Sequence, residues 1–357
     1  MKKVLLFSLL FFCFVGSVSA STSTASSYVL MDQTTGRVLE GKNYNTPYLI
    51  ASITKIMTCL VAIESGRLDD VVVVDEVIKD SYGSGIYIEV GEKLTLRDLL
   101  YGLMLRSGND AALMVAKYVG GEVEEFVKMM NSKAREIGMT NTIFNNPSGL
   151  DNTDSGNYST SYDMGLLTRY AMKYKEYRKI VGTKSYKLKT NKKSYIWKNK
   201  NKLLQYDYIT GGKTGYTEKA KRTLVSTASY DNIDLIVVTI RDSDDWNTHK
   251  SLYDEAFSMY KAYKVLNKRS FDVVGDRFYR GEFFIKNDVY IPLKDGEGNN
   301  LIGRVKLDGT YDYKNGDKVG EYLIYLDDKY LYKENIYISN VNKRQKRLFS
   351  IFRENTL

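Results

Sequence analysis

Two neighbouring runs rich in β-branched and apolar residues constrain the fold of this chain more than any other feature. They are TLVSTASY (223–230) and LIVVTI (235–240), and only a few residues around Asp231-Asn232 separate them. β-Branched side chains favour strands, and a short polar connection favours a tight turn between antiparallel strands. The sequence therefore predicts two adjacent strands of one antiparallel sheet in this part of the chain.

Helical periodicity surrounds this strand region on both sides. Apolar residues at 53, 56, 57, 60 and 61 follow the spacing of a helix over 52–65. Further helices are predicted at 95–106, 110–119, 122–137, 160–174 and 247–264, and Gly138 is predicted to be the C-cap of the helix at 122–137. Two short strands are predicted in 28–40 and a turn-rich segment at 140–158. A helical block placed between strand regions predicts an α+β domain with a mainly antiparallel sheet.

The last part of the chain has a different pattern. Short β-like runs such as VYIPL and YLIYL lie between residues 271 and 338, with Gly and Asp turns between them. Such runs predict a small all-β domain. We therefore divide the 357 residues into an N-terminal segment 1–20, an α+β domain 21–268, a β-rich domain 269–339 and a tail 340–357.

Residues 1–20 have the form of a secretion signal peptide. Lys2 and Lys3 precede an apolar run over 4–15, and VSA (18–20) is a small-x-small cleavage site. An uncleaved anchor is the weaker interpretation, because the run is short for a membrane span and small and polar residues follow it. The sequence thus predicts export to an extracytoplasmic location.

Few residues remain for metal or histidine chemistry once this segment is removed. Cys59 is then the single thiol and His249 the single histidine. Neither an intramolecular disulfide nor a zinc site of several His or Cys ligands can form. A Ser-His-Asp triad would have to use His249, whose core-like neighbours Leu252 and Phe257 indicate a surface or packing histidine rather than a catalytic one.

Three short motifs stand out together. Ser52-Ile53-Thr54-Lys55 begins a predicted helix, so that the serine hydroxyl and the lysine amine share one helix face near N-terminal amides that favour negative charge. Ser107-Gly108-Asn109 lies between two helices, and Lys213-Thr214-Gly215 opens a strand. Each motif alone is common. In this order, 55 and then 106 residues apart, they form the signature of penicillin-recognising serine enzymes.

Longer segments extend this match. They are ASITKIMT (51–58), GEKLTLRDLLYGLMLRSGNDAA (91–112), MNSKAREIGMTNTIFNNPSGL (130–150) and GGKTGYT (211–217). From about Tyr28 to Tyr263 the chain resembles the D-alanyl-D-alanine carboxypeptidases, which are low-molecular-weight penicillin-binding proteins. The resemblance implies a β-lactamase/transpeptidase-like catalytic domain over 21–268 and a small all-β C-terminal domain. It also implies removal of the terminal D-alanine from peptidoglycan stem pentapeptides through an acyl-enzyme, acylation by penicillin and other β-lactams, and no cofactor or metal.

The resemblance implies catalytic roles for three residues. Ser52 would attack the carbonyl carbon, Lys55 would take its proton, and Ser107 would relay a proton to the leaving nitrogen. Lysine has a reference pKa near 10.4 and acts as a base only when it is neutral. Burial and a nearby positive charge both lower such a pKa, and the resemblance places Lys213 close enough to Lys55 to supply the second effect.

Substrate binding is implied for five residues. Asn109 would hold the amide of the substrate and Thr214 its terminal carboxylate, while Lys213 adds positive potential. Gly215 would let the substrate backbone lie close against the strand. The backbone N–H groups of the nucleophile and of Tyr216 would form the oxyanion hole, where loss of one donor typically costs ~10²–10³-fold in rate.

The sequence departs from the family pattern at three places. Many relatives have histidine where Tyr216 follows the third motif, and because the implied contact there is a backbone one, we expect a change in rate or specificity. Many relatives also have histidine near Asn157, so a histidine there is not needed in this chain. Tyr48-Leu49 replaces a pair that often contains proline.

Two other functions are alternatives to the carboxypeptidase. A serine β-lactamase shares the three motifs, but no Glu-x-x-x-Asn segment lies between Asn109 and Lys213 to activate a deacylating water, and a β-rich appendage is unusual for that class. A non-catalytic wall-binding protein is disfavoured because all the motif residues are intact.

The tail is predicted to lie on a membrane surface. On a helical wheel one half holds Val341, Leu348, Phe349, Ile351 and Phe352, and the other half holds Lys343, Lys346, Arg347 and Arg353. A basic amphipathic helix of this kind binds anionic membrane surfaces, although it is too short and charged to span a bilayer. A frayed, solvated tail is the alternative. Nucleic acid is not predicted as a partner, because export separates the protein from it.

Overall fold

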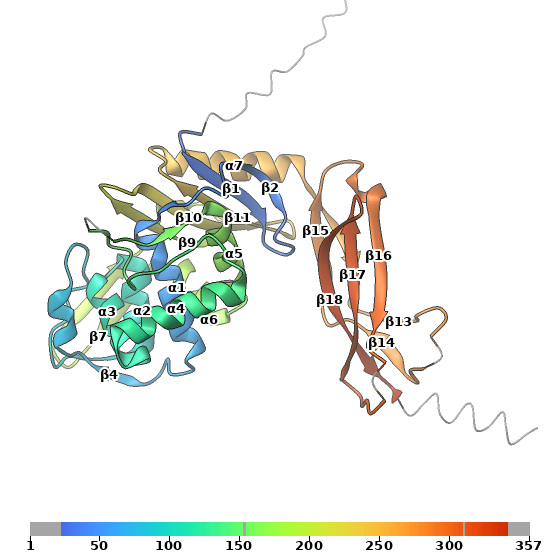
Figure 1. Ribbon diagram of the computed structural model, residues 1–357, viewed down its shortest axis with the longest axis horizontal. Coiled ribbons are helices and arrows are strands. Elements are labelled where there is room, and N and C mark those ends of the chain that lie inside the picture. The colour runs from blue at the N-terminus through green and yellow to red at the C-terminus, as the bar shows by residue number, and fades with distance from the viewer. Residues whose placement is uncertain (1–22, 153–154, 277, 310, 342–357) are drawn as a thin grey trace, which may run out of the picture.

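The computed structural model describes residues 23–152, 155–276, 278–309 and 311–341. Figure 1 shows a larger unit, with helices on both faces of a sheet, beside a narrower unit made of strands. The predicted signal peptide and nearly all of the predicted tail lie outside the described residues. Within the described ranges, no helix combines the length and the apolar character needed to cross a bilayer.

A five-stranded antiparallel sheet forms the centre of the larger unit, in the order β2-β1-β11-β10-β9. The strands are β1 (Ser27–Asp32), β2 (Val38–Lys42), β9 (Ile209–Thr217), β10 (Lys221–Tyr230) and β11 (Ile233–Ile240). The β10–β11 pairing confirms the predicted hairpin. Asp231 and Asn232 at its tip have φ of 47° and 61°, as expected for a two-residue turn that requires positive φ at both positions. β9, which carries the third motif, is an edge strand.

Alternation along the strands sends side chains into two separate cores. Val225 and Val238 pack with the helical block, whereas Leu224 and Val237 pack with helix α7 (Asp245–Met259). Successive side chains of a strand point to opposite faces, and full burial of each such side chain is worth roughly 1.5–3 kcal/mol. The sheet therefore separates α7 from the helices that carry the first two motifs.

The helices predicted for the helical block are present to within a few residues, and two further helices, Glu76–Asp80 and Lys175–Gly182, were not predicted. The block comprises η1 (Ala51–Thr54), α1 (Lys55–Glu64), η2 (Glu76–Asp80), α2 (Leu96–Tyr101), η3 (Gly102–Arg106), α3 (Asn109–Gly120), α4 (Val123–Ile137), α5 (Ser161–Ala171) and α6 (Lys175–Gly182). Thr95 and Asp98 form a capping box at the start of α2. Gly138 ends α4 with φ 89°, which confirms the predicted glycine C-cap.

Three two-stranded sheets and one short helix complete the larger unit. They are β3 (Tyr48–Leu49) with β6 (Tyr158–Ser159), β4 (Val71–Val73) with β5 (Lys93–Thr95), β7 (Ser185–Lys189) with β8 (Ser194–Lys198), and η4 (Lys202–Gln205).

The predicted helix over 247–264 is wrong at its C-terminal end. Helix α7 stops at Met259, and strand β12 (Lys261–Leu266) follows at once. β12 pairs with β15 (Val289–Leu293), beginning with Lys261 opposite Leu293. The chain leaves the helix because a strand almost thirty residues further on pairs with it, and local periodicity cannot register such a long-range contact.

The C-terminal unit is a small all-β domain, as predicted. Its other elements are β13 (Ser270–Phe271), β14 (Glu282–Phe284), η5 (Glu297–Asn300), β16 (Leu301–Leu307), β17 (Lys318–Leu326) and β18 (Lys329–Ser339), with five strands in the order β13-β14-β18-β17-β16. Ile291 and Ile324 lie in one core of this domain, and Ile336 and Ile338 in another. An ion pair between Arg37 and Glu297 connects the two units at 2.5 Å.

Candidate active site

The first motif lies where a 3-10 turn runs into a helix. Ser52 is in η1, and Lys55 is the first residue of α1. Ala51, directly before the serine, has φ 48°, a left-handed conformation that is costly for a residue with a side chain and that gathers at functional sites. Ser52 is partly accessible while Lys55 is fully buried. The hydroxyl can thus meet a ligand from solvent while the amine cannot.

The buried amine of Lys55 has three contacts. Its Nζ lies 3.1 Å from Oγ of Ser52 and donates to Oδ1 of Asn109 over 2.7 Å. It also donates to the backbone carbonyl of Ser148, over 2.5 Å. The structure therefore brings the first and second motifs together through a single nitrogen atom.

The second motif follows a π-helical turn, η3, which ends at Arg106. Single π turns inside helices occur frequently at functional sites. Ser107 then adopts the left-handed conformation, with φ 66°, and Asn109 begins α3. The Asn109 side chain is held at both ends, because its Oδ1 accepts from Lys55 and its Nδ2 donates to the Tyr82 carbonyl over 2.6 Å. Its orientation is thereby set before any ligand binds.

The third motif joins the second through Lys213. This lysine is buried on β9, and its Nζ donates to Ser107 Oγ over 3.0 Å and to the Thr214 carbonyl over 2.6 Å. Thr214 is partly accessible, and Tyr216 is 61% exposed. The Tyr216 side chain, at the position where many relatives have histidine, is therefore largely in solvent.

Gly215 lies where β9 approaches the nucleophile segment most closely. A Cβ built on Gly215 would fall 2.4 Å from Thr223 Oγ1 and 2.9 Å from the backbone nitrogen of Ser52. Both distances are shorter than real side chains tolerate, and the second neighbour is backbone. The absence of a side chain at this position is thus required by the protein's own packing, in addition to the predicted approach of a substrate.

Burial and like charge lower the pKa values of both site lysines. Desolvation by burial is the main cause for Lys55, followed by the positive charges of Lys213 and then Lys200, and its pKa falls well below the ordinary value. Burial, followed by the charge of Lys200, lowers the pKa of Lys213 to about 7. Burial and like charge therefore favour the neutral form of Lys55, which is the form that a general base must have.

Two partners of Lys55 were not predicted from the sequence. The Ser148 carbonyl lies in the turn-rich segment, where the sequence offers no signal for a single carbonyl oxygen. Lys200 follows β8, and its Nζ donates to Ser84 Oγ over 3.3 Å. A run of lysines around it was the available signal, but only the folded chain shows which of them acts on the buried amines.

Asn157, where many relatives have histidine, fixes the turn-rich segment against the nucleophile segment. Its Nδ2 donates to Thr54 Oγ1 and to the Asn146 carbonyl, over 2.9 Å each. Its Oδ1 accepts from the backbone nitrogen of Asn145 over 2.7 Å. The segment that delivers the Ser148 carbonyl to Lys55 is therefore tied to the helix that carries the lysine.

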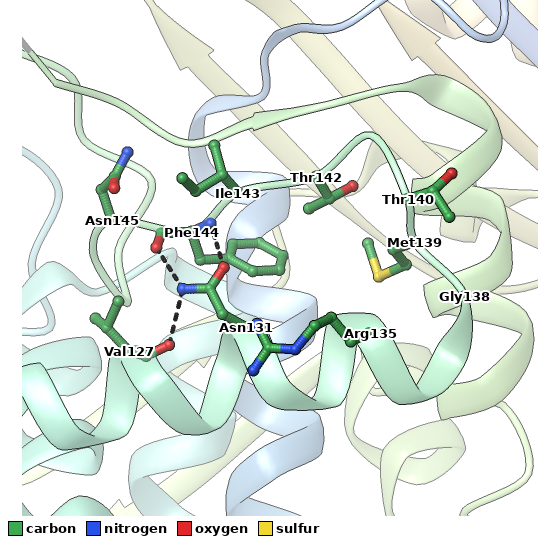
Figure 2. Close-up of a pocket in the computed structure, with 10 residues that line it drawn as sticks. All are labelled: Val127, Asn131, Arg135, Gly138, Met139, Thr140, Thr142, Ile143, Phe144 and Asn145. Atoms are coloured by element: carbon green, nitrogen blue, oxygen red, sulfur yellow. Dashed lines mark hydrogen bonds between the residues drawn. The ribbon is translucent and has the colours of Figure 1, made fainter.

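A second anchor of this segment lines a pocket of about 640 Å³ between α4 and residues 138–145. Figure 2 shows Asn131 on α4 reaching up to the segment, with its Nδ2 donating to the carbonyls of Val127 and Phe144 and its Oδ1 accepting from Phe144 N. No residue of the three motifs lines this pocket. Asn131 therefore supports the site from outside it.

A smaller hollow of about 210 Å³ reaches the site itself. Tyr82, Asn109, Ser148 and Leu150 are among its lining residues. Its wall includes the Ser148 carbonyl, which accepts from the Lys55 amine, and the Tyr82 carbonyl, which accepts from Asn109.

The two residues that could support rival chemistry lie in cores. His249 is buried, hydrogen-bonds through Nδ1 to Ser226 at 2.6 Å and through Nε2 to Thr239 at 3.1 Å, and has its pKa lowered to about 3 by burial. It belongs to α7, on the face of the sheet opposite the motifs. Cys59 is also buried, and burial raises the pKa of its thiol. Both are packing residues.

A serine hydroxyl facing a buried lysine of lowered pKa, with a second lysine bonded to a nearby serine, is an arrangement of serine acyl-transfer enzymes. Residues 15–244 match the sequence profile of a family described as D-alanyl-D-alanine carboxypeptidase. The chain belongs to this family and is a serine-type D-Ala-D-Ala carboxypeptidase. Residues 278–344 match the profile described as the C-terminal domain of penicillin-binding protein 5.

Individual relatives agree with this assignment. The chain is 36% identical over 293 residues to the D-alanyl-D-alanine carboxypeptidase DacF of Bacillus subtilis. The matched region covers 78% of this chain and 75% of the relative. It is 32% identical to DacB2 of Mycobacterium tuberculosis over 68% of this chain and 86% of the relative. The crystal structure of penicillin-binding protein 5 from Haemophilus influenzae covers 91% of this chain and 99% of its own, with a TM-score of 0.72 and 27% identity. The predicted fold and enzyme class are confirmed.

Proposed function

We propose that eight residues of the three motifs carry out the carboxypeptidase reaction of this chain. Ser52, Lys55 and Ser107 are assigned to catalysis, and Asn109, Lys213, Thr214, Gly215 and Tyr216 to substrate binding. The observation that carries this proposal is the hydrogen-bond geometry of the Lys55 amine.

Two of the three Lys55 contacts are amide oxygens, from Asn109 and Ser148, and such oxygens only accept. A neutral amine has two protons, so both are donated to these oxygens. Its lone pair is left facing Ser52 Oγ at 3.1 Å. A general base must lie within hydrogen-bond reach of the proton that it takes, and the lowered pKa of Lys55 provides the neutral form.

In the acylation step, Ser52 Oγ attacks the carbonyl carbon of the penultimate D-alanine and its proton moves to Lys55 Nζ. The oxyanion that forms is bound by the backbone N–H groups of Ser52 and Tyr216. The close approach of β9 to the nucleophile segment supports this, because a Cβ at Gly215 would lie 2.9 Å from Ser52 N. The C–N bond then breaks, and an ester joins Ser52 to the shortened peptide.

The leaving D-alanine nitrogen must receive a proton as the bond breaks. Ser107 delivers it, and Lys213, which donates to Ser107 Oγ over 3.0 Å, resupplies it. A pKa of about 7 suits Lys213 to this exchange near neutral pH. Water then attacks the ester carbonyl and gives a proton through Ser107 to the neutral Lys213, and Ser52 recovers its proton from Lys55 as the shortened stem peptide leaves.

The terminal carboxylate of the substrate binds beside Thr214, with Lys213 adding positive potential. The substrate backbone lies along the accessible edge of β9, and Asn109 holds its amide. Lys200 adds a further positive charge, since it lowers the pKa values of both buried lysines. An anionic chain end is therefore drawn towards Ser52.

The cellular location of the enzyme is inferred from its N-terminal and C-terminal segments. Residues 1–20 direct export, residues 21–268 form the catalytic domain, and residues 269–339 form the β-domain. The basic amphipathic tail, 340–357, holds the enzyme on the outer face of the cytoplasmic membrane, where stem pentapeptides are its substrate and penicillin its covalent inhibitor. Deletion of residues 341–357 should release the mature protein from membranes with little loss of activity; a truncated protein that stays in the membrane pellet would contradict this.

Mass spectrometry tests the chemistry. Purified residues 21–357 should release D-alanine from diacetyl-Lys-D-Ala-D-Ala, and penicillin should add one covalent adduct that peptide mapping places on Ser52. With nitrocefin the enzyme should give a stoichiometric adduct rather than sustained turnover, which separates it from a β-lactamase. An adduct on any other residue would overturn the assignment of the nucleophile.

A further inference from the structure

The β7–β8 hairpin has an unusual charge pattern. Residues 183–202 contain eight lysines, no arginine and no acidic residue. The lysines are Lys184, Lys187, Lys189, Lys192, Lys193, Lys198, Lys200 and Lys202. Neither the catalytic assignment nor the packing of the hairpin accounts for most of them.

The strand register places lysines on one face of this hairpin. Ser185 lies opposite Lys198, Lys187 opposite Ile196, and Lys189 opposite Ser194, and all six are exposed. Cross-strand partners point to the same side of a sheet. We call the lysines at 187, 189 and 198 the hairpin lysines, and alternate positions along a strand put such groups roughly 6–7 Å apart.

The opposite face of the hairpin is packed and rigid. The Tyr186 ring stacks on Tyr101 of α2 with centroids 3.8 Å apart, and on Trp197 at 6.2 Å. Arg106 donates to the Lys198 carbonyl over 3.2 Å, and Lys200 N donates to the Leu105 carbonyl over 3.1 Å. The hairpin lysines therefore stand on a fixed platform, next to the segment that leads into Ser107.

The hairpin lysines have no partner of opposite charge among the residues that the structure describes. Lys192 and Lys193, in the turn, both form ion pairs with Glu89. No ion pair links a described carboxylate to Lys187, Lys189 or Lys198. Three neighbouring ammonium groups repel one another, and the protein supplies no carboxylate that pairs with them among its described residues. An anionic ligand that binds here would neutralise their charge.

We propose that the exposed face of the β7–β8 hairpin binds a linear polymer that carries repeated phosphodiester groups. The proposal rests on the export proposed above, which places this face among the polymers of the cell envelope. Lysine is a compact point charge that binds phosphate oxygens without fixed geometry, whereas planar carboxylates are better matched by arginine, which this hairpin lacks. A row of lysines suits a flexible chain of phosphates.

A membrane surface fits this face less well. A segment that binds in the interface buries apolar side chains beneath its basic ones. On the hairpin, Tyr186, Leu188, Tyr195 and Trp197 face the protein, and Ile196, 64% exposed, is the single apolar side chain among the six exposed strand positions. Figure 1 also places β7 at the end of the catalytic unit away from the β-domain, beside α2 and α3. The polymer would therefore be held near the active site.

The test measures binding of poly(glycerol phosphate) to the mature protein by isothermal titration calorimetry at several NaCl concentrations. The variant K187Q/K189Q/K198Q should bind at least tenfold more weakly than the wild type at 50 mM NaCl. The slope of log K against log salt should fall by about 2, since each contact with a single-stranded polyanion contributes about 0.7.

A matched control removes the same charge elsewhere. Lys306, Lys314 and Lys329 are exposed lysines of the β-domain, and K306Q/K314Q/K329Q should bind within twofold of the wild type. Both variants should keep the thermal midpoint and the D-alanine release from a soluble peptide, which tests the proposed function separately. Equal weakening in both variants would overturn the proposal. So would hairpin-dependent binding to phosphatidylglycerol vesicles without binding to the polymer.

Discussion

Lys213 Nζ donates to Ser107 Oγ over 3.0 Å, and this one bond joins the third motif to the second. Lys55 joins the first motif to the second in the same way, through Asn109. The three segments are thus one hydrogen-bonded network with two buried lysines, and the positive charge of Lys213 helps to lower the pKa of Lys55. The predictions below test separate parts of that network.

Replacement of the nucleophile tests the chemistry most directly. Ser52→Ala removes one hydroxyl oxygen and no packing group, so D-alanine release should fall by at least about 10⁴-fold and penicillin labelling should disappear. The free energy of unfolding should stay within about 1 kcal/mol of wild type. Release and labelling by the variant, measured beside a denaturation curve, check this; labelling that survives would mean that another residue is acylated.

Removal of the Lys213 charge should change the pH dependence of acylation. The positive charge of Lys213 helps to keep the Lys55 pKa low, so in Lys213→Ala that pKa rises. A higher pH is then needed to leave Lys55 neutral. The acidic limb of the acylation rate should therefore move to higher pH. Penicillin acylation rates from pH 5 to 9 measure it. An unchanged acidic limb would show that Lys213 acts on the substrate alone.

The motifs could be predicted because each is local and their combination is rare. The predicted hairpin at Asp231-Asn232 and the glycine end of α4 are local as well, and both are confirmed. The helical pattern continued past Met259 into a segment that pairs with β15, and there the prediction failed. Pairing between distant strands is decided by the whole fold rather than by periodicity.

The features of the site that could not be predicted are the contacts between segments that are far apart in the sequence. The Ser148 carbonyl and the Lys200 charge reach Lys55 from segments far along the chain. The packing of Gly215 against the Ser52 backbone is of the same kind. A sequence motif names the reacting side chains, but it does not show which backbone atoms and charges surround them.

Gly215→Ala tests that packing. The new Cβ would meet Thr223 Oγ1 and the backbone nitrogens of Ser52 and Ile53, so β9 and the nucleophile segment must separate. Overpacking of this kind costs about 1–3 kcal/mol of stability, and activity should fall by roughly 10²-fold because an oxyanion donor is displaced. Gly298→Ala is the control, since its Cβ would meet only the edge of the Tyr263 ring. Full activity in Gly215→Ala would show that the contact is not needed.

Lys200→Gln should produce a weaker form of the Lys213 effect. The Lys200 charge lowers the pKa values of both buried lysines, but its effect is smaller than that of burial. Acylation at pH 6 should therefore slow by about 2–5-fold, with little change at pH 9, and added salt should reduce the difference. Lys202→Gln, an exposed neighbour, should leave the rate unchanged; equal slowing in both variants would remove any specific role for Lys200.

Burial of the Lys213 amine should make the folded protein less stable than it would be with an apolar side chain at this position. Burial lowers the pKa of Lys213 from 10.5 to about 7, so between these pH values the unfolded chain binds more protons than the folded one and stability rises with pH. At pH 7 or below, burial of the Lys213 amine lowers the free energy of unfolding by its full amount, which is 1.36 kcal/mol for each unit of lowered pKa. The two hydrogen bonds of the amine offset only about 1 kcal/mol each. Lys213→Met should therefore be inactive yet more stable than wild type by roughly 1–3 kcal/mol at pH 7. Above the ordinary lysine pKa the wild-type amine is neutral in both states, so the advantage should vanish or reverse near pH 10.5. Urea unfolding of both proteins at pH 7 and pH 10.5 measures the difference, and a methionine variant that is less stable at pH 7 would show that the buried amine is not a cost to the fold.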